Sequence, residues 1–536
     1  MAQGHLPASL GQSSARRSER ASQPQVRAMD RLLAVLLGSL VVLGQTCAGY
    51  HDSFWYVFAL TISGTSLVIS LVLLILSRTS SGKAQELMCV SAAVLACLWL
   101  VGTAFMTVKA PYVVTGNGYF GSWVALIFSW LLAVEHSPSL KAPLDGLVAN
   151  GGVSVAMLTL ASLVVFCQTV WHVIDHHGVD HFEVVWVLVC SGFSLFVLLL
   201  LHVQSVSEKI KNHFTLIAVF LFLWWSVGWF VATFDFPYRL TGNGFFGCWV
   251  ALFYAFELAD TAGGLGLQQR AESTTRNIPR ALLGVTLGSA VVLVAITYNG
   301  CWGSHHSGWC SWAFVCSCIS LVVCAFLCIV MAIGSGSKVE GALPHVAVFL
   351  LLWWTIGTGI MTFEHPFTAT TNGYFGAWLA VVCSAVLCHD HAQSLQDFVG
   401  RFGEHGRLLP LLFLASVTLL VQVLFDTFDD WEHKNLPVAW IVAAGTLSIC
   451  LVMMLTRSKE DIGRILMVVM LLLWAGGVGV LTFDAPYLHT GNAYFACWCG
   501  LCVSALAVWR LYPDVVRRAM PEAGEPPAAV VGVSVV

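Results

Sequence analysis

One phrase recurs four times along the chain, and it constrains the fold more than any other feature. Each copy runs from a threonine through a charged residue and a proline to a turn ending in asparagine, then to an aromatic pair and a tryptophan. The asparagines are Asn117, Asn243, Asn372 and Asn492, so successive copies lie 126, 129 and 120 residues apart. A repeat of this length is a complete structural unit rather than one turn of a solenoid. The sequence therefore predicts four tandem units of similar fold.

The composition places these units in a membrane. Of the 536 residues, 58% are hydrophobic and only 10% are charged, whereas soluble domains carry about 25% charged residues. Each unit holds four apolar runs of about 17–24 residues, long enough to cross a bilayer as helices. We predict an all-α integral membrane protein with about 16 transmembrane helices. Its four-helix repeats are expected at 31–140, 149–262, 280–392 and 406–511.

The distribution of basic residues gives the orientation. If both termini lie inside, 22 of the 25 Lys and Arg residues fall on the cytoplasmic side, and only Lys109, Arg239 and Lys434 fall outside. Cytoplasmic loops of membrane proteins carry the excess of positive charge. This split predicts an even number of spans with both termini cytoplasmic. It places the repeated phrase on the outer face.

The two ends are expected to be tails. Residues 1–30 are rich in Ser, Ala and Arg, which favours a disordered basic tail, with an organelle transit peptide as the alternative. Residues 512–536 are expected to be disordered and end in Ser534-Val535-Val536. That ending has the form of a peptide that adds a strand to a PDZ domain.

The phrase itself reads as a turn at which the fourth helix re-enters the membrane. Its proline ends the third helix, its small residues and asparagine reverse the chain, and the asparagine can cap the fourth helix. The tryptophan and its aromatic neighbours suit the membrane interface. The residues of this re-entry turn are Pro111, Asn117, Trp123, Pro237, Asn243, Trp249, Pro366, Asn372, Trp378, Pro486, Asn492 and Trp498.

A charged position precedes each proline and leaves two interpretations open. It holds Lys109, Asp235, Glu364 and Asp484. Around a common axis these residues would form an outer vestibule that attracts cations, with Lys109 paired to a carboxylate of a neighbouring unit. Alternatively, each acid lies at the water interface beside the positive end of the fourth helix.

Two further patterns concern packing. The third apolar run of each unit has a tryptophan followed by a glycine three residues later, as at Trp99 and Gly102, which would let a neighbouring helix approach closely. The second run has a serine at a matching place, namely Ser66, Ser194, Ser320 or Ser448, which we interpret as an interhelical hydrogen-bonding residue. Cys301 and Cys310 bracket an outer loop, where they would be a disulfide or two free thiols.

Motifs for chemistry are lacking. There is no phosphate-binding loop, zinc-protease pattern or nucleophile elbow. His and carboxylate residues cluster in outer loops with a different spacing in each unit, so they specify no metal geometry. We expect no enzymatic activity, no cofactor, no metal and no nucleic-acid partner; the lipid bilayer is the expected partner.

A four-span unit with both ends inside, small outer loops and aromatic interfaces resembles the MARVEL-type and related tetraspan proteins in topology. This resemblance implies membrane organisation, scaffolding or trafficking in the plasma membrane or an endomembrane. The alternative function is a channel or facilitator for a small solute or cation that passes between the four units. A channel predicts a continuous polar path between the four units. A membrane organiser predicts a centre that is filled by side chains.

Overall fold

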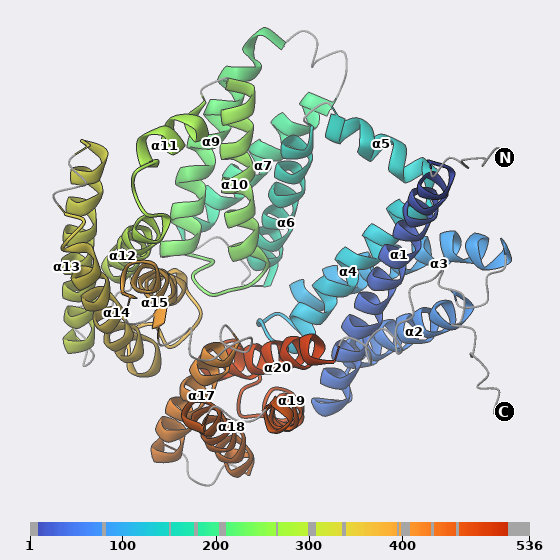
Figure 1. Ribbon diagram of the computed structural model, residues 1–536. Helices are drawn as coiled ribbons and strands as arrows, with labels where there is room; N and C mark the ends of the chain where they lie inside the picture. Colours follow the sequence, from blue (N-terminus) through green and yellow to red (C-terminus); the bar gives the residue numbers. More distant parts are fainter. Residues whose placement is uncertain are drawn as a thin grey trace, which may run out of the picture.

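In the computed structural model the chain is helical, and four groups of four long helices surround a common centre (Figure 1). The structure describes residues 9–77, 82–149, 152–175, 181–202, 211–263, 266–298, 307–334, 339–393, 396–397, 408–429, 434–456 and 460–512. No strand occurs in these ranges beyond an isolated bridge between Gly116 and His489. The chain folds as an all-α, multi-pass membrane protein.

The helices follow one another in the same order in each group, here called bundles one to four. Bundle one contains α1 (Ser9–Ala48), α2 (Phe54–Ser77), α3 (Gly82–Val108) and α4 (Asn117–His136). Bundle two contains α6 (Val153–Asp175), α7 (Phe182–His202), α9 (Phe214–Phe230) with the π-turn η2 (Val231–Asp235), and α10 (Asn243–Gly263). Bundle three contains α12 (Arg280–Tyr298), α13 (Ser307–Ala332), α14 (Leu343–Gly359) with the π-turn η4 (Ile360–Glu364), and α15 (Asn372–His391). Bundle four contains α17 (Leu409–Asp429), α18 (Leu436–Thr456), α19 (Glu460–Leu481) and α20 (Asn492–Leu511). The short helices α5 (Pro138–Ala149), η1 (Lys211–His213) and α11 (Leu267–Thr275) lie in connections.

Within each bundle the first helix packs against the second and fourth, and the third helix packs against the same two. Each bundle has its own core of buried apolar residues. A tryptophan of the third helix is fully buried in all four, namely Trp99, Trp225, Trp354 and Trp474. The glycine that follows each tryptophan lies against a side chain of the second helix: Gly228 faces Cys190 and Gly357 faces Cys316. The close helix approach predicted from the sequence is confirmed.

The serine prediction holds in two bundles. Ser66 accepts a hydrogen bond from the indole of Trp99 at 2.7 Å and pairs with Ser39 of α1 at 2.8 Å. Ser320 makes the same contacts with Trp354 and Ser289 at 2.8 Å each. Ser194 instead donates to a carbonyl of its own helix, and Ser448 is exposed. In bundle four the buried residue that pairs with the first helix is Thr446, bonded to Ser416 at 2.8 Å.

Within the part of the chain that the structure describes, fifteen helices are long and apolar enough to span a membrane, one fewer than predicted. The helix that differs is α10, whose C-terminal third carries Glu257 and Asp260. It packs against α6 and α9 as its counterparts pack in the other bundles. The carboxylates, not the packing, distinguish it.

Helix α1 begins at Ser9 and so runs through most of the stretch predicted to be a disordered tail. The apolar part of α1 supplies a nucleus on which the Ala-, Arg- and Gln-containing segment propagates as helix. The C-terminal tail and its PDZ-type ending, beyond residue 512, lie outside the described residues.

Candidate functional site: the junction of the four bundles

The four copies of the repeated phrase meet at the centre of the molecule, where each asparagine bonds to the preceding bundle. Asn243 donates to Thr107 Oγ1 at 2.9 Å, and Asn372 donates to Thr233 Oγ1 at 2.9 Å. Asn492 donates to Thr362 Oγ1 at 3.1 Å. Asn117 of bundle one donates to Thr482 of bundle four, at 2.7 Å to its carbonyl and 3.0 Å to its hydroxyl. The bundles therefore form a closed ring rather than a row.

These asparagines do not cap the fourth helices as predicted. Each is the first residue of its helix, and the residue before it takes the capping position. Only Thr371 caps with its side chain, accepting from the Tyr374 N–H. The asparagine side chain is free to cross to the next bundle because Gly116 and Gly491 occupy the cap position of α4 and α20 in extended conformations.

The asparagine oxygen accepts hydrogen bonds from the repeated tryptophans. Trp123 donates to Asn243 at 3.2 Å, Trp249 to Asn372 at 3.1 Å, Trp378 to Asn492 at 3.1 Å and Trp498 to Asn117 at 3.0 Å. Two tyrosine hydroxyls join them, from Tyr119 to Asn243 at 2.8 Å and from Tyr494 to Asn117 at 3.0 Å. Each asparagine thus both donates to and accepts from the bundle before it. The sequence suggested only an interfacial role for these aromatic residues.

Four threonine hydroxyls close the axis of the ring. Thr115 and Thr241 lie 2.7 Å apart, Thr241 and Thr370 2.7 Å, Thr370 and Thr490 2.9 Å, and Thr490 and Thr115 2.7 Å. Each hydroxyl can donate to one neighbour and accept from the other. In a square of this size the centre lies about 2 Å from each oxygen, less than the 2.3–2.6 Å that Ca²⁺ requires. The ring leaves no room for an ion larger than Mg²⁺ to pass.

A layer of phenylalanines fills the space next to the threonines. Phe120, Phe246, Phe375 and Phe495 each pack against the cores of two neighbouring bundles. The rings of Phe375 and Phe495 are 6.4 Å apart, and Tyr119 lies 6.4 Å from Phe246. These separations are typical of aromatic packing. At this level the half-buried phenylalanines therefore link each bundle to the next.

All four prolines follow a cis peptide bond, and the chain makes the same contact after each. The N–H of the next residue bonds back to the end of the third helix, from Tyr112 to Met106 at 2.8 Å and from Tyr238 to Ala232 at 2.7 Å. Phe367 bonds to Met361 at 2.8 Å, and Tyr487 to Leu481 at 2.9 Å. The predicted end of the third helix before each proline is confirmed in all four turns.

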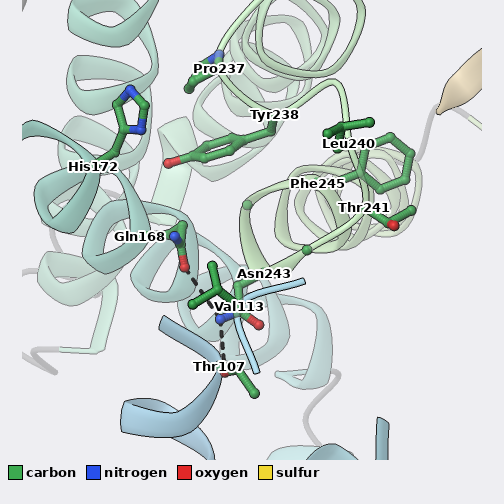
Figure 2. Close-up of a pocket in the computed structure, with 12 residues that line it drawn as sticks. Thr107, Val113, Gln168, His172, Pro237, Tyr238, Leu240, Thr241, Asn243 and Phe245 are labelled. Atoms are coloured by element: carbon green, nitrogen blue, oxygen red, sulfur yellow. Dashed lines mark hydrogen bonds between the residues drawn. The ribbon is translucent and has the colours of Figure 1, made fainter. Parts of the chain in front are cut away.

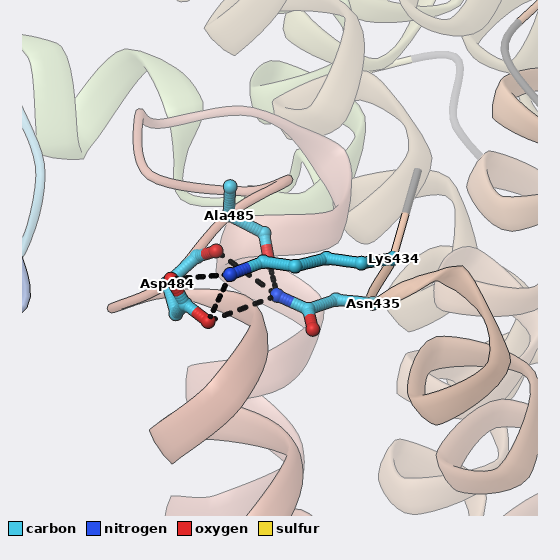
Figure 3. A network of polar contacts seen from close by, with 4 residues as sticks. All are labelled: Lys434, Asn435, Asp484 and Ala485. Atoms are coloured by element: carbon cyan, nitrogen blue, oxygen red, sulfur yellow. Dashed lines mark hydrogen bonds and ion pairs between the residues drawn. The ribbon is translucent and has the colours of Figure 1, made fainter. Parts of the chain in front are cut away.

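The charged positions before the prolines have local partners. Asp235 pairs with Arg239 of the same turn at 3.0 Å. Asp484 pairs with Lys434 at 2.9 Å and accepts from Asn435, both at the start of α18 in its own bundle (Figure 3). Glu364 has no ion pair among the described residues. Asp235 and Asp484 are thus neutralised within their own bundles, which gives no support to a cation vestibule shared by all four positions.

Among the described residues, Lys109 has no carboxylate partner in a neighbouring bundle, in contrast to one of the two expectations. Its ammonium lies 4.9 Å from the ring centre of Trp55 in α2 and 4.8 Å from that of Trp171 in α6. Aromatic faces attract cations through their quadrupole. Lys109 therefore joins bundles one and two through cation–π contacts, which explains why a base replaces the acid in this copy of the phrase.

Removing the charge of Lys109 is expected to destabilise this boundary by about 0.5–1 kcal/mol, the range for exposed cation–π contacts. Lys109→Met keeps the aliphatic chain and should lower the thermal unfolding midpoint in detergent, whereas Lys109→Arg should not. In a double-mutant cycle, Lys109→Met should have a smaller effect when Trp171 is already Leu. If the effects of Lys109→Met and Trp171→Leu on the unfolding midpoint are additive, the two side chains do not interact.

A cavity of about 160 Å³ lies at the boundary of bundles one and two (Figure 2). Gln168 and Thr107 both accept from Asn243 on its wall, and His172 lies one turn beyond Gln168 on α6. The Tyr238 hydroxyl bonds to Thr169 at 2.7 Å, and burial raises the pKa of this phenol well above its usual value. Most polar groups of the cavity are thus hydrogen-bonded to one another.

No group of three or more His, Cys, Asp or Glu side chains that could hold a metal occurs among the described residues. Cys310 is disulfide-bonded; Cys301, the partner suggested by the sequence, lies outside the described residues. Comparison of the chain with protein-family models, with curated proteins and with solved structures finds no match. The function is therefore argued from the geometry of the junction.

Proposed function

We propose that the protein is a non-enzymatic membrane scaffold whose four tandem four-helix repeats form one rigid unit that organises the surrounding bilayer, in membrane organisation or trafficking. The observation that carries the proposal is the bonded junction. Each bundle boundary joins an asparagine, a threonine and a tryptophan, the four threonine hydroxyls bond to one another around the axis, and the phenylalanines bridge neighbouring bundles. These contacts support assembly, because hydroxyls bonded to one another form a closed ring rather than an open path.

The orientation belongs to the same proposal. The distribution of Lys and Arg supports both termini on the cytoplasmic side and the junction near the outer face. The fifteen apolar helices, with α10 as the sixteenth of the pattern, support a unit of about 16 spans.

The proposal predicts that the protein conducts nothing. Liposomes that contain the purified chain should pass K⁺ and glycerol no faster than protein-free liposomes, because the hydroxyl ring and the phenylalanine layer block the axis. Asp235→Asn, Glu364→Gln and Asp484→Asn should change protein abundance at most. A flux that rises with the amount of protein, and falls in these variants, would establish the channel instead.

A further inference from the structure

The fourth helices carry a second repeated feature, which the function above does not use. In each fourth helix the phenylalanine lies three residues after the asparagine. The residues seven, ten and fourteen positions after the asparagine are large and apolar or are cysteines, except for Glu257. These positions are Val124, Ile127 and Leu131; Val250, Phe253 and Glu257; Leu379, Val382 and Val386; and Cys499, Cys502 and Leu506. We call these four sets the inner stripes.

The inner stripes lie on the same helix faces as the central phenylalanines. Steps of four, three and four residues keep side chains on one side of an α-helix. Each phenylalanine contacts a neighbouring bundle, so the stripes on the same helix faces also point away from their own bundle. Yet they are uncovered: Ile127 is 50% exposed, Phe253 61% and Val382 52%.

The stripes are uncovered because the stronger helix contacts between neighbouring bundles lie near the junction. The helix contacts between bundles are those of α12 with η2 and of α17 with η4, at the outer ends, apart from weaker pairs. The ring contacts across boundaries, such as Phe230 with Tyr298 and Phe363 with Phe425, are at the same level. Beyond it the exposed stripes of α4, α10, α15 and α20 line the space between the bundles, which we call the chamber (Figure 1).

The size of this chamber matches one leaflet. From the phenylalanine to the last stripe position is eleven residues, or about 16 Å of helix, and half of the hydrocarbon core is about 15 Å. Polar residues follow one turn later at the other end, namely Glu135, Asp260, Asp390 and Arg510. They stand where headgroups would be.

Apart from Glu257 at the last stripe position, this chamber offers water no polar partners, and apolar cavities stay dry. Acyl chains are the apolar molecules at hand in a bilayer, and they can enter between bundles that do not touch. We propose that the inner stripes hold the acyl chains of phospholipids from the cytoplasmic leaflet, beneath the closed junction. The inference rests on the proposed scaffold and its orientation, and it names the lipid that the scaffold holds.

The lipid site can be tested by filling the chamber with bulky side chains. The double variant Ile127→Trp/Val382→Trp places indoles on the stripes of bundles one and three. The matched control Ile75→Trp/Val322→Trp makes the same changes in the same bundles on α2 and α13, at the periphery of Figure 1, where the side chains are 59% and 69% exposed. Both are reconstituted in phosphatidylcholine–phosphatidylethanolamine vesicles, re-extracted in mild detergent, and assayed for bound phospholipid per chain.

The chamber variant should retain about half as much tightly bound lipid as the control, because indoles replace the acyl segments in a closely packed space. Equal retention overturns the inference.

Cys499 and Cys502 give a second measurement on the otherwise native chain. Both are free and exposed on the stripe of α20. In the same vesicles an uncharged, membrane-soluble maleimide should label more thiols in the native chain than in the Cys499→Ser/Cys502→Ser variant. A charged, impermeant thiol reagent applied to both membrane faces should show no such difference. Labelling of these two cysteines by the charged reagent means a hydrated chamber and overturns the lipid site. If the charged reagent labels these cysteines and the vesicles still pass no K⁺, only the lipid site is wrong and the scaffold proposal stands. If the vesicles pass K⁺, both the lipid site and the scaffold proposal are wrong.

Discussion

Replacing Asn243 with alanine is expected to destabilise the protein by about 2–4 kcal/mol, since each interhelical hydrogen bond in a membrane contributes about 0.6–2 kcal/mol. The side chain makes four contacts, to Thr107, Gln168, Tyr119 and Trp123. Its loss leaves the Tyr119 hydroxyl and the Trp123 indole without an acceptor at a buried boundary. The thermal unfolding midpoint in detergent measures the effect, and size-exclusion chromatography should show a broader particle.

The matched control is Asn212→Ala, the same substitution at an exposed asparagine in η1, which should leave the midpoint unchanged. Combining Asn243→Ala with Trp123→Phe should cost less than the sum of the two single changes, because the indole no longer has an acceptor to lose. A neutral Asn243→Ala would mean that the hydrogen bonds do not hold the boundary.

Adding one carbon at Gly244 should be nearly as harmful. A Cβ there would lie 2.5 Å from the ring of Tyr238, and the corresponding glycines Gly118 and Gly373 face the ring of their own turn at 2.4 and 2.3 Å. We expect Gly244→Ala to cost about 1–3 kcal/mol through overpacking, again measured as a lower unfolding midpoint.

Bundle four supplies the natural comparison for this change. It has Ala493 at the same position, and its turn differs: Ala485 has a φ of 72°, and the Tyr487 hydroxyl bonds to Asp426 at 2.7 Å. Ala493→Gly should therefore cost only the small entropic penalty of a helical glycine, about 0.5–1 kcal/mol. Gly359→Ala, at a helical glycine with open space around it, serves as the control and should be neutral or stabilising. A tolerated Gly244→Ala would show that the rings have room to move.

The helices were predictable because hydrophobic length and helix-ending prolines are local signals. The closure of the ring was not, because it depends on which polar side chains meet across bundles. The sequence did hold a signal for it: the threonine that opens the phrase, the asparagine and the tryptophan are present in all four copies. A helix-capping role explained why an asparagine stands in each turn. It did not explain why a threonine opens every copy of the phrase. The sequence left two interpretations of the charged position, a shared cation vestibule and separate charges at the water interface. The contacts of Lys109 with Trp55 and Trp171 fit neither of them.

The boundary between bundles four and one has no linker, yet it carries the same bonds as the three that do. Asn117 reaches Thr482, Trp498 reaches Asn117, and Thr490 reaches Thr115, just as their counterparts do where the chain is continuous. Covalent connection is therefore not what defines the assembly. The four bundles are arranged like the subunits of a cyclic tetramer with heterologous interfaces, within a single polypeptide. Differences among its quarters, such as Lys109 in one and Ala493 in another, are possible because a single chain need not repeat itself.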